Sequence, residues 1–216
     1  MSTNFEFLEK NWPMLHDIAE QAEDYIYTDP QSSLAKMRLL VEKYTDIIAV
    51  SSNVDFEPRT NLNNKLKVLK YYRILDNSDV ISLFHDIKNT GNSAVHDFYD
   101  DSEEALINLK KTFVLSKWVC NYYGNFPSNS NKKFINPIKI INAKPKEIDT
   151  LAEKEFEESL LELKNQSSRL SKTDLDEKIK SIREKSHDFF FNADLSEADT
   201  RILFIDPKLR EAGWIA

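Results

Sequence analysis

Glycine is almost absent from this chain, with Gly 3 in 216 residues, at positions 91, 124 and 213. Average proteins use glycine at about 7% of their positions. Hairpins with two-residue turns and phosphate-binding loops both depend on it, because glycine adopts backbone angles that other residues avoid. The scarcity therefore disfavours strand sandwiches, tightly turned sheets and phosphate-cradling loops, and it favours helices.

Charge and hydropathy narrow the class further. Lys+Arg 29 against Asp+Glu 36 gives a net charge of −7, and the mean hydropathy is −0.52. No stretch approaches the roughly 20 apolar residues of a membrane-spanning helix. The first residues, Met1 to Glu6, show no secretory signal, and a single cysteine, Cys120, allows no internal disulfide. We therefore expect a cytoplasmic protein with no membrane contact, whose bulk charge does not attract nucleic acid but which can carry local basic patches.

Apolar residues recur at three- and four-residue steps through the first 123 residues, as in amphipathic helices. Helix-start signals precede four of the five such stretches, because Asp and Asn cap helices and proline suits the first turn. Thr90-Gly91-Asn92-Ser93 is predicted to break the fourth helix, and Gly124 is predicted to end the fifth. The sequence thus predicts an all-α fold that begins with a bundle over 1–123. Its helices are expected to start near Pro13, Asp29-Pro30, Leu62, Asp76-Asn77 and Asp101-Ser102.

The helical pattern of apolar residues stops after Gly124. Residues 124–146 hold prolines and polar residues that do not sustain a helix, and they are predicted to form a linker or a strap over the bundle. Three of their lysines, Lys132, Lys133 and Lys139, are candidates for contact with a nucleic-acid backbone, and the alternative is a solvated linker. Residues 147–195 combine dense mixed charge with a helical apolar stripe, which predicts a charged helical connector interrupted at Ser171-Lys172-Thr173.

The segment from Lys88 to His96 is the strongest candidate for chemistry. It holds a cation, amides and an imidazole around Gly91, so Lys88, Asn92 and His96 can share one face. Histidine can act as a general base toward a ribose hydroxyl, and a cation can stabilise the charge that develops on the phosphorus, as in a metal-independent RNase. The alternative is that Gly91-Asn92 ends a helix and that the imidazole caps a turn or fills a buried polar slot.

Other reactive residues offer less. His16, His85 and His187 are scattered and lack the spacing of a zinc site, so no metal is expected. Cys120 lies among apolar residues, as a core cysteine does. The acidic residues between 97 and 104 suit a helix start better than a cation site. The sequence contains no Walker A motif, nucleophile elbow or dinucleotide fingerprint.

Two separated stretches resemble one family. The opening Asn4-Phe5-Glu6-Phe7-Leu8, the Asp29-Pro30 helix start and Gly91-Asn92-Ser93-Ala94-Val95-His96 resemble the N-terminal helical domain of some type I restriction-modification R subunits. The tail resembles the first residues of the endonuclease domain of those subunits, through Ser196 to Arg201 and then Ile205 to Trp214. We therefore expect 196–216 to be the start of a truncated nuclease domain, with the charged helices as the connector of the family.

The resemblance implies a large parent protein that translocates DNA with ATP and cuts it with Mg²⁺. Its family partners are a methyltransferase subunit and a DNA-specificity subunit. The resemblance therefore implies that the parent protein contacts DNA as part of this complex. The nuclease of this family is similar to the PD-(D/E)xK class, whose metal-binding carboxylates lie further along the chain than residue 216. We therefore expect this chain to hold no cofactor and to be non-catalytic, acting in assembly or DNA contact.

The helical domain also resembles the HEPN superfamily, whose active members carry an arginine four to six residues before a histidine. Here Lys88 stands in place of that arginine, and seven residues separate it from His96. Lysine does not make the forked phosphate contact of arginine. A HEPN-like RNase that uses His96, with Asn92 and Lys88 in support, remains the alternative function.

Overall fold

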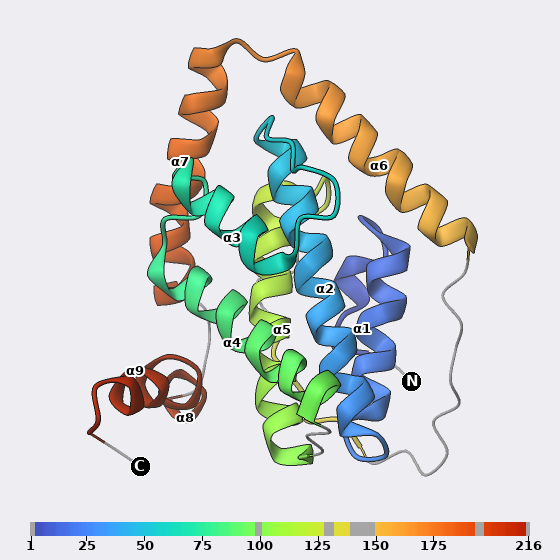
Figure 1. The fold of residues 1–216 in the computed structure, drawn as a ribbon, viewed down its shortest axis with the longest axis vertical. Coiled ribbons are helices and arrows are strands. Elements are labelled where there is room, and N and C mark those ends of the chain that lie inside the picture. The colour runs from blue at the N-terminus through green and yellow to red at the C-terminus, as the bar shows by residue number, and fades with distance from the viewer. Residues whose placement is uncertain (1–2, 98–100, 128–131, 139–149, 193–196, 215–216) are drawn as a thin grey trace.

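Two long helices, α2 (Pro30–Ser51) and α5 (Ser102–Tyr123), form the centre of the molecule. The computed structural model describes residues 3–97, 101–127, 132–138, 150–192 and 197–214 (Figure 1). These residues contain helices and no strand, which confirms the predicted all-α class. The other long helices are α1 (Pro13–Tyr25), α3 (Leu62–Tyr71), α4 (Ser78–Asp97), α6 (Thr150–Ser168) and α7 (Lys172–Asn192). Short helical turns cover Glu6–Leu8, α8 (Glu197–Thr200), Arg201–Ile205 and α9 (Asp206–Glu211).

Helix α2 packs against most of the other long helices. It contacts α1, α3, α4, α5 and α6, and Figure 1 shows it between α1 on one side and α3 and α4 on the other. Its side chains are therefore buried over much of its circumference. The hydroxyl groups of Tyr44 on α2 and Ser116 on α5 lie 2.6 Å apart in a hydrogen bond, so neither polar atom is left unpaired in the core.

The predicted helix starts are confirmed, because the capping is local. The Asp29 carboxylate accepts the amide hydrogen of Ser32 at 3.0 Å, directly before Pro30. The Asp101 carboxylate accepts amide hydrogens from Glu103 at 2.8 Å and Glu104 at 3.1 Å. Each cap satisfies amide groups that have no partner within the first turn of a helix.

The predicted break at 90–93 is wrong. Helix α4 continues through these residues to Asp97. The physical reason is the crossing of α4 over α2: a Cβ atom on Gly91 would lie 2.5 Å from the Cβ of Arg38 and 3.0 Å from the carbonyl oxygen of Leu34. Gly91 therefore allows two helices to approach closely. Gly124 does end α5 as predicted, although its φ of −88° does not use the left-handed region.

Helices α6 and α7 pack against the bundle. Phe156 of α6 is buried against α1 and α2, and the Ser167 hydroxyl donates to the carbonyl oxygen of Val50 at 2.6 Å. The Trp118 indole N–H of α5 donates to the Ser186 hydroxyl of α7 at 2.9 Å. This contact fixes α7 alongside α5. The residue boundaries predicted between bundle, linker, connector and nuclease start stay a prediction.

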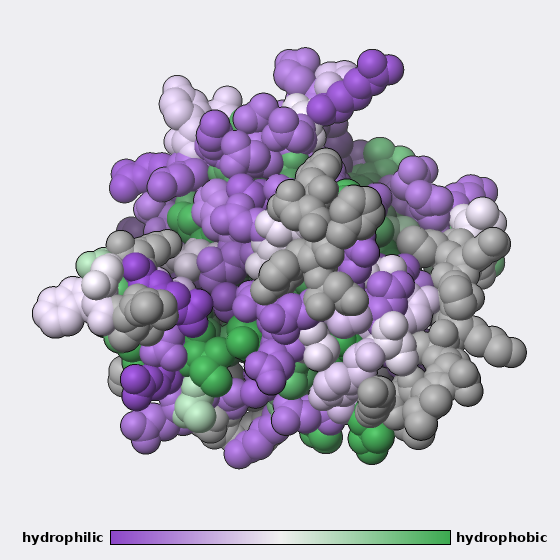
Figure 2. All heavy atoms as spheres, turned by 60° about the horizontal axis from the view of Figure 1, so that its bottom comes forward, coloured by the Kyte–Doolittle hydropathy of each residue, from purple (hydrophilic) through white to green (hydrophobic). Residues whose placement is uncertain are grey.

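One face of the molecule is mainly polar. On the face shown in Figure 2, hydrophilic side chains predominate and apolar groups occupy small separate areas. Among the described residues, no helix combines the length and the apolar character needed to cross a bilayer.

Candidate functional site

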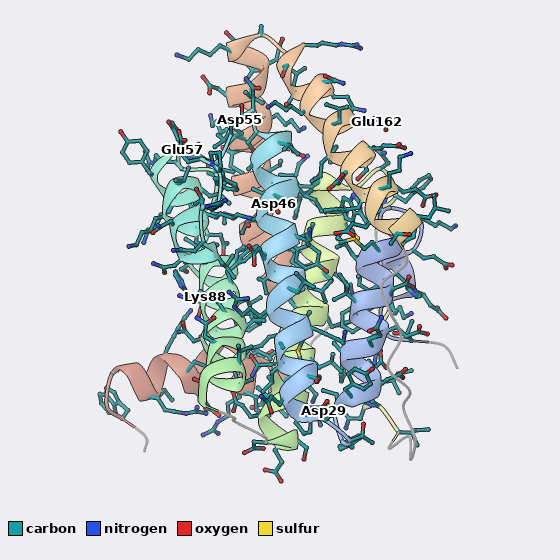
Figure 3. All side chains as sticks on the ribbon, turned by 45° about the vertical axis from the view of Figure 1, so that its right-hand side comes forward. Asp29, Asp46, Asp55, Glu57, Lys88 and Glu162 are labelled. Atoms are coloured by element: carbon teal, nitrogen blue, oxygen red, sulfur yellow. The ribbon has the colours of Figure 1, made fainter. Side chains whose placement is uncertain are left out.

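A polar face of α4 carries Lys88 and Asn92, one helical turn apart. The Lys88 ammonium donates to the side-chain oxygen of Asn63, at the start of α3, at 3.2 Å. Figure 3 shows Lys88 on α4, on the same side of α2 as α3. Burial lowers the pKa of Lys88, and the nearby charge of Lys67 lowers it further. Lys88 and Asn92 therefore lie on the same face of α4, because the helix continues without a break between them.

Arg38 joins this face from α2. Its Nε donates to the Asn92 side-chain oxygen at 2.6 Å, and its Nη1 lies 4.0 Å from a carboxylate oxygen of Glu42. The sequence analysis missed this arginine, because Arg38 and Asn92 are 54 residues apart in the chain. Gly91 could have indicated this contact. A glycine inside a helix can mark the place where a second helix crosses closely, as well as the end of the helix.

The polar network extends from Glu42 to α3. The Lys65 ammonium lies 3.5 Å from Glu42 and 2.7 Å from Asp46. Burial raises the pKa of the Asp46 carboxyl above its usual range, and the hydrogen bond from Lys65 opposes that rise. The carboxylates of α2 thus have lysine and arginine partners within the chain, so the network links α2, α3 and α4 mechanically.

The predicted histidine is only partly described. His96 belongs to the last turns of α4, but its side chain lies outside the described part of the structure. The structure does not test a joint action of His96 with Lys88 and Asn92. His85, one turn before Lys88, has its pKa lowered by burial and then by the charges of Lys88 and Lys70, with Asp86 acting in the opposite sense. This environment favours the neutral imidazole.

The three lysines predicted to touch nucleic acid differ in their surroundings. The Lys132 ammonium donates to the carbonyl oxygen of Thr3 at 2.9 Å and lies 3.1 Å from the Glu6 carboxylate. Lys133 is exposed, and Lys139 lies outside the described residues. The part of the predicted strap that contains Lys132 therefore lies against the N-terminal residues, and Lys132 already has partners there.

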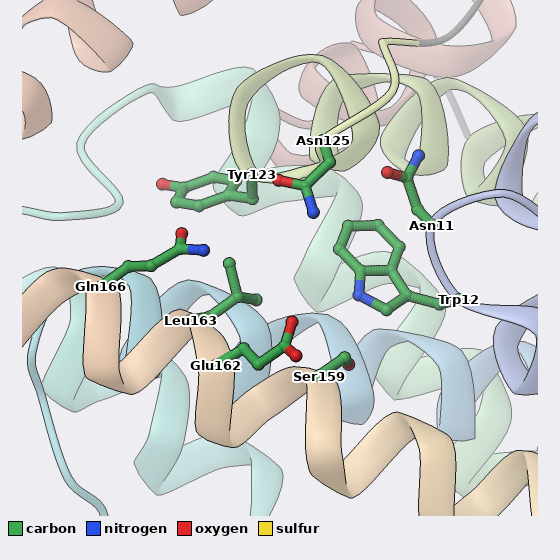
Figure 4. A pocket seen from close by; sticks show the side chains of 8 residues that line it. All are labelled: Asn11, Trp12, Tyr123, Asn125, Ser159, Glu162, Leu163 and Gln166. Atoms are coloured by element: carbon green, nitrogen blue, oxygen red, sulfur yellow. The ribbon is translucent and has the colours of Figure 1, made fainter.

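A cavity between α6 and the bundle is lined by Trp12 and Tyr123 on one side and by Glu162 and Gln166 of α6 on the other (Figure 4). Its volume is about 30 Å³. One water needs roughly 10–15 Å³ of such space and typical ligand pockets have roughly 300–1,000 Å³, so this cavity has room for water but is small for an organic substrate.

The parts of the chain that the structure describes offer neither a metal-binding cluster nor a reactive thiol. These parts hold no cluster of three or more His, Cys, Asp or Glu side chains suited to a metal ion. Burial raises the pKa of the Cys120 thiol to about 12, so the thiol stays protonated and unreactive at neutral pH. This is consistent with the predicted core role of Cys120.

Together, the helical fold, the polar face of α4 and the packed charged helices define a helical protein with an internal polar network that joins α2, α3 and α4. No family model matches the chain, and no solved structure matches it. It is similar to the type I restriction enzyme EcoKI endonuclease subunit of Escherichia coli (strain K12), at 31% identity over 116 residues.

That alignment covers 54% of this chain and 10% of the E. coli protein. The similarity supports the resemblance to the restriction-subunit family that the sequence segments showed. The name of the E. coli protein describes a subunit, which is one component of an enzyme with several chains.

Proposed function

We propose that this chain is an N-terminal accessory region of a type I restriction enzyme R subunit, serving assembly with partner subunits or contact with DNA. The observation that carries the proposal is the 31% identity to the EcoKI endonuclease subunit over 116 residues. The packing of α6 and α7 on the bundle supports it, because a rigid helical body suits a docking role better than a loose spacer does.

In this proposal the parent protein supplies the catalysis. An ATP-driven motor and a PD-(D/E)xK nuclease that binds Mg²⁺ belong to the full-length subunit, and the methyltransferase and specificity subunits are its partners. The contribution of this chain is non-catalytic. Its internal ion pairs hold the helices in fixed positions, so the chain can present a fixed surface to a partner subunit.

Binding to the cognate methyltransferase–specificity core tests the proposal. The purified chain is mixed with that core, and with duplex DNA in a separate arm, and association is followed by light scattering coupled to size exclusion. Full-length R subunit serves as the positive control. A complex with the core or with DNA supports the proposal, whereas no binding to either, beside strong binding by the full-length subunit, refutes it.

A second candidate is a HEPN-like RNase that uses His96, supported by Asn92 and Lys88. The observation that favours it is the 2.6 Å hydrogen bond from Arg38 of α2 to Asn92 of α4. This bond places a guanidinium next to α4, which has a lysine, Lys88, where the HEPN pattern has an arginine. A guanidinium can contact a phosphate through two parallel hydrogen bonds. In this candidate, Arg38 holds the phosphate while the imidazole of His96 removes the ribose proton.

Cleavage of structured RNA distinguishes this candidate from the first. The wild-type chain is compared with His96→Ala, and with Arg38→Lys as the variant that keeps the charge and loses the fork. Loss of cleavage in both variants supports the RNase. Equal cleavage by wild type and His96→Ala, or none by either, removes it.

A further inference from the structure

Helix α3 packs on α2 with one face and leaves the opposite face exposed. Leu62, Leu66 and Leu69 are buried in the hydrophobic core. Lys67 and Lys70, which are three residues apart, are exposed and therefore lie next to each other on the outer face. The helix thus presents a short row of cations to solvent.

Two tyrosines complete this outer face at the end of α3. Tyr71 is 80% exposed and Tyr72 is 58% exposed, and their ring centroids are 5.2 Å apart at an interplanar angle of 82°. Tyrosine is enriched at binding surfaces, because its ring is apolar and its hydroxyl tolerates water. The two rings offer accessible flat faces beside the lysines.

A further cation approaches from α4. The charge of Lys67 acts on Lys88, and the charges of Lys70 and Lys88 both act on His85. The Lys88 ammonium also lies 3.2 Å from the side-chain oxygen of Asn63, which is one helical turn before Lys67 on the same face of α3, so Lys88 lies beside the α3 lysines. We refer to Lys67, Lys70 and Lys88 as the α3–α4 basic cluster.

This cluster differs from the other lysines of an acidic chain. Within the described residues, neither Lys67 nor Lys70 forms an ion pair, although the net charge of the chain is −7. Asp86, whose charge acts on His85 beside this cluster, is paired with Lys111 at 2.7 Å. Seven other lysines have carboxylate partners among the described residues: Lys65–Asp46, Lys110–Asp199, Lys111–Asp86, Lys132–Glu6, Lys164–Asp55, Lys180–Glu184 and Lys208–Asp79.

We propose that the outer face of α3, with Lys67, Lys70, Tyr71 and Tyr72, binds single-stranded DNA, with Lys88 as a flanking cation. The lysines would contact successive phosphates, and the tyrosine rings would stack on unpaired bases. Duplex DNA keeps its bases stacked inside, so it would engage the lysines and leave the rings unused. The choice of DNA over RNA rests on the proposed restriction function, whereas the preference for an unpaired strand rests on the exposed rings.

Fluorescence anisotropy of a labelled oligothymidylate of about 20 nucleotides tests this proposal with the whole chain at low salt. Lys67→Ala/Lys70→Ala removes two phosphate contacts and should lower the slope of log K against log salt by about 1.4. Tyr71→Ala/Tyr72→Ala should weaken binding by about 30-fold or more and leave that slope unchanged, because stacking is uncharged.

A matched control removes two exposed lysines elsewhere. Lys10 precedes α1 and Lys154 lies on α6, and in Figure 1 these helices lie on the other side of α2 from α3. Lys10→Ala/Lys154→Ala changes the net charge by the same amount as the test variant. It should bind like the wild type, and circular dichroism should show equal helicity in all four proteins.

Several outcomes overturn the proposal. These are no binding of the oligothymidylate, an equal loss in the control variant, or tighter binding of duplex DNA without an effect of the tyrosine variant. Tighter binding of oligouridylate overturns the assignment to DNA, and displacement by polyglutamate at equal charge overturns the assignment to nucleic acid. If the chain binds the methyltransferase–specificity core but not the oligothymidylate, this inference fails while the proposed function stands.

Discussion

Replacing Gly91 with alanine tests the reasoning about the crossing of α2 and α4. The added Cβ would lie 2.5 Å from the Cβ of Arg38, 3.0 Å from the Leu34 carbonyl oxygen and 3.3 Å from the Arg38 Cδ. Ordinary contacts of such atoms are near 3.5–4 Å. The two closest atoms belong to the backbone of α2 or are fixed directly to it, so the helix itself must move to relieve the overlap.

Two opposing effects set the size of the change. Alanine is favoured over glycine in the interior of a helix by about 1 kcal/mol. Forcing an extra methyl group into a packed contact costs about 1–3 kcal/mol, and a clash with a helix backbone belongs at the upper end of that range. We therefore expect the free energy of unfolding to fall by about 2 kcal/mol. For a chain of this size the corresponding fall in Tm is about 4–8 °C.

Thermal and urea unfolding, followed by circular dichroism, measure this change. Ser93→Ala is the matched control, because it lies two residues further along α4 and adds no atom. Its stability should stay within about 0.5 kcal/mol of the wild type. If Gly91→Ala proves as stable as the wild type or more so, helix propensity decides the outcome and the close crossing is refuted.

Of three further predictions, two concern contacts that hold outer segments and one concerns the buried thiol. Ser186→Ala leaves the indole N–H of Trp118 buried without its partner, so the free energy of unfolding should fall by about 1–3 kcal/mol in urea titrations followed by tryptophan fluorescence. Asn4→Ala removes the two hydrogen bonds that Asn4 exchanges with the backbone of Ile135, so limited trypsin digestion should cut the neighbouring segment faster while the helical content stays constant. Because burial raises the pKa of Cys120 to about 12, a disulfide reagent at pH 8 should modify the thiol only on unfolding; rapid modification of the folded chain would contradict its burial.

The predictions that held depend on neighbours in the sequence. An aspartate followed by proline, as at Asp29, and an aspartate followed by acidic residues, as at Asp101, satisfy amide groups within three residues. Such caps need no tertiary contact, so the helix starts follow from the sequence alone. The prediction at Gly91 was wrong because its packing partner, Arg38, lies on another helix, and only the crossing distinguishes a spacer from a helix end.

The candidate site shows the same limit. The sequence predicts that Lys88 and Asn92 share a face, but not that Asn63 and Arg38 bind them from α3 and α2. The sequence shows no sign that the outer face of α3 is special, because lysines are common in a charged chain. Only the packing of the helices shows which lysines have acidic partners. Long-range pairing therefore decides the chemistry of each lysine.

Association with the cognate methyltransferase–specificity core is the most direct test of the central claim that this chain is an accessory region of a type I restriction R subunit. Light scattering coupled to size exclusion measures the mass of the core alone and of the core mixed with the chain. The account predicts a new species whose mass exceeds that of the core by one or more copies of the 25.2 kDa chain. An unchanged core mass, together with no retention of duplex DNA and a normal complex formed by the full-length subunit, would contradict it.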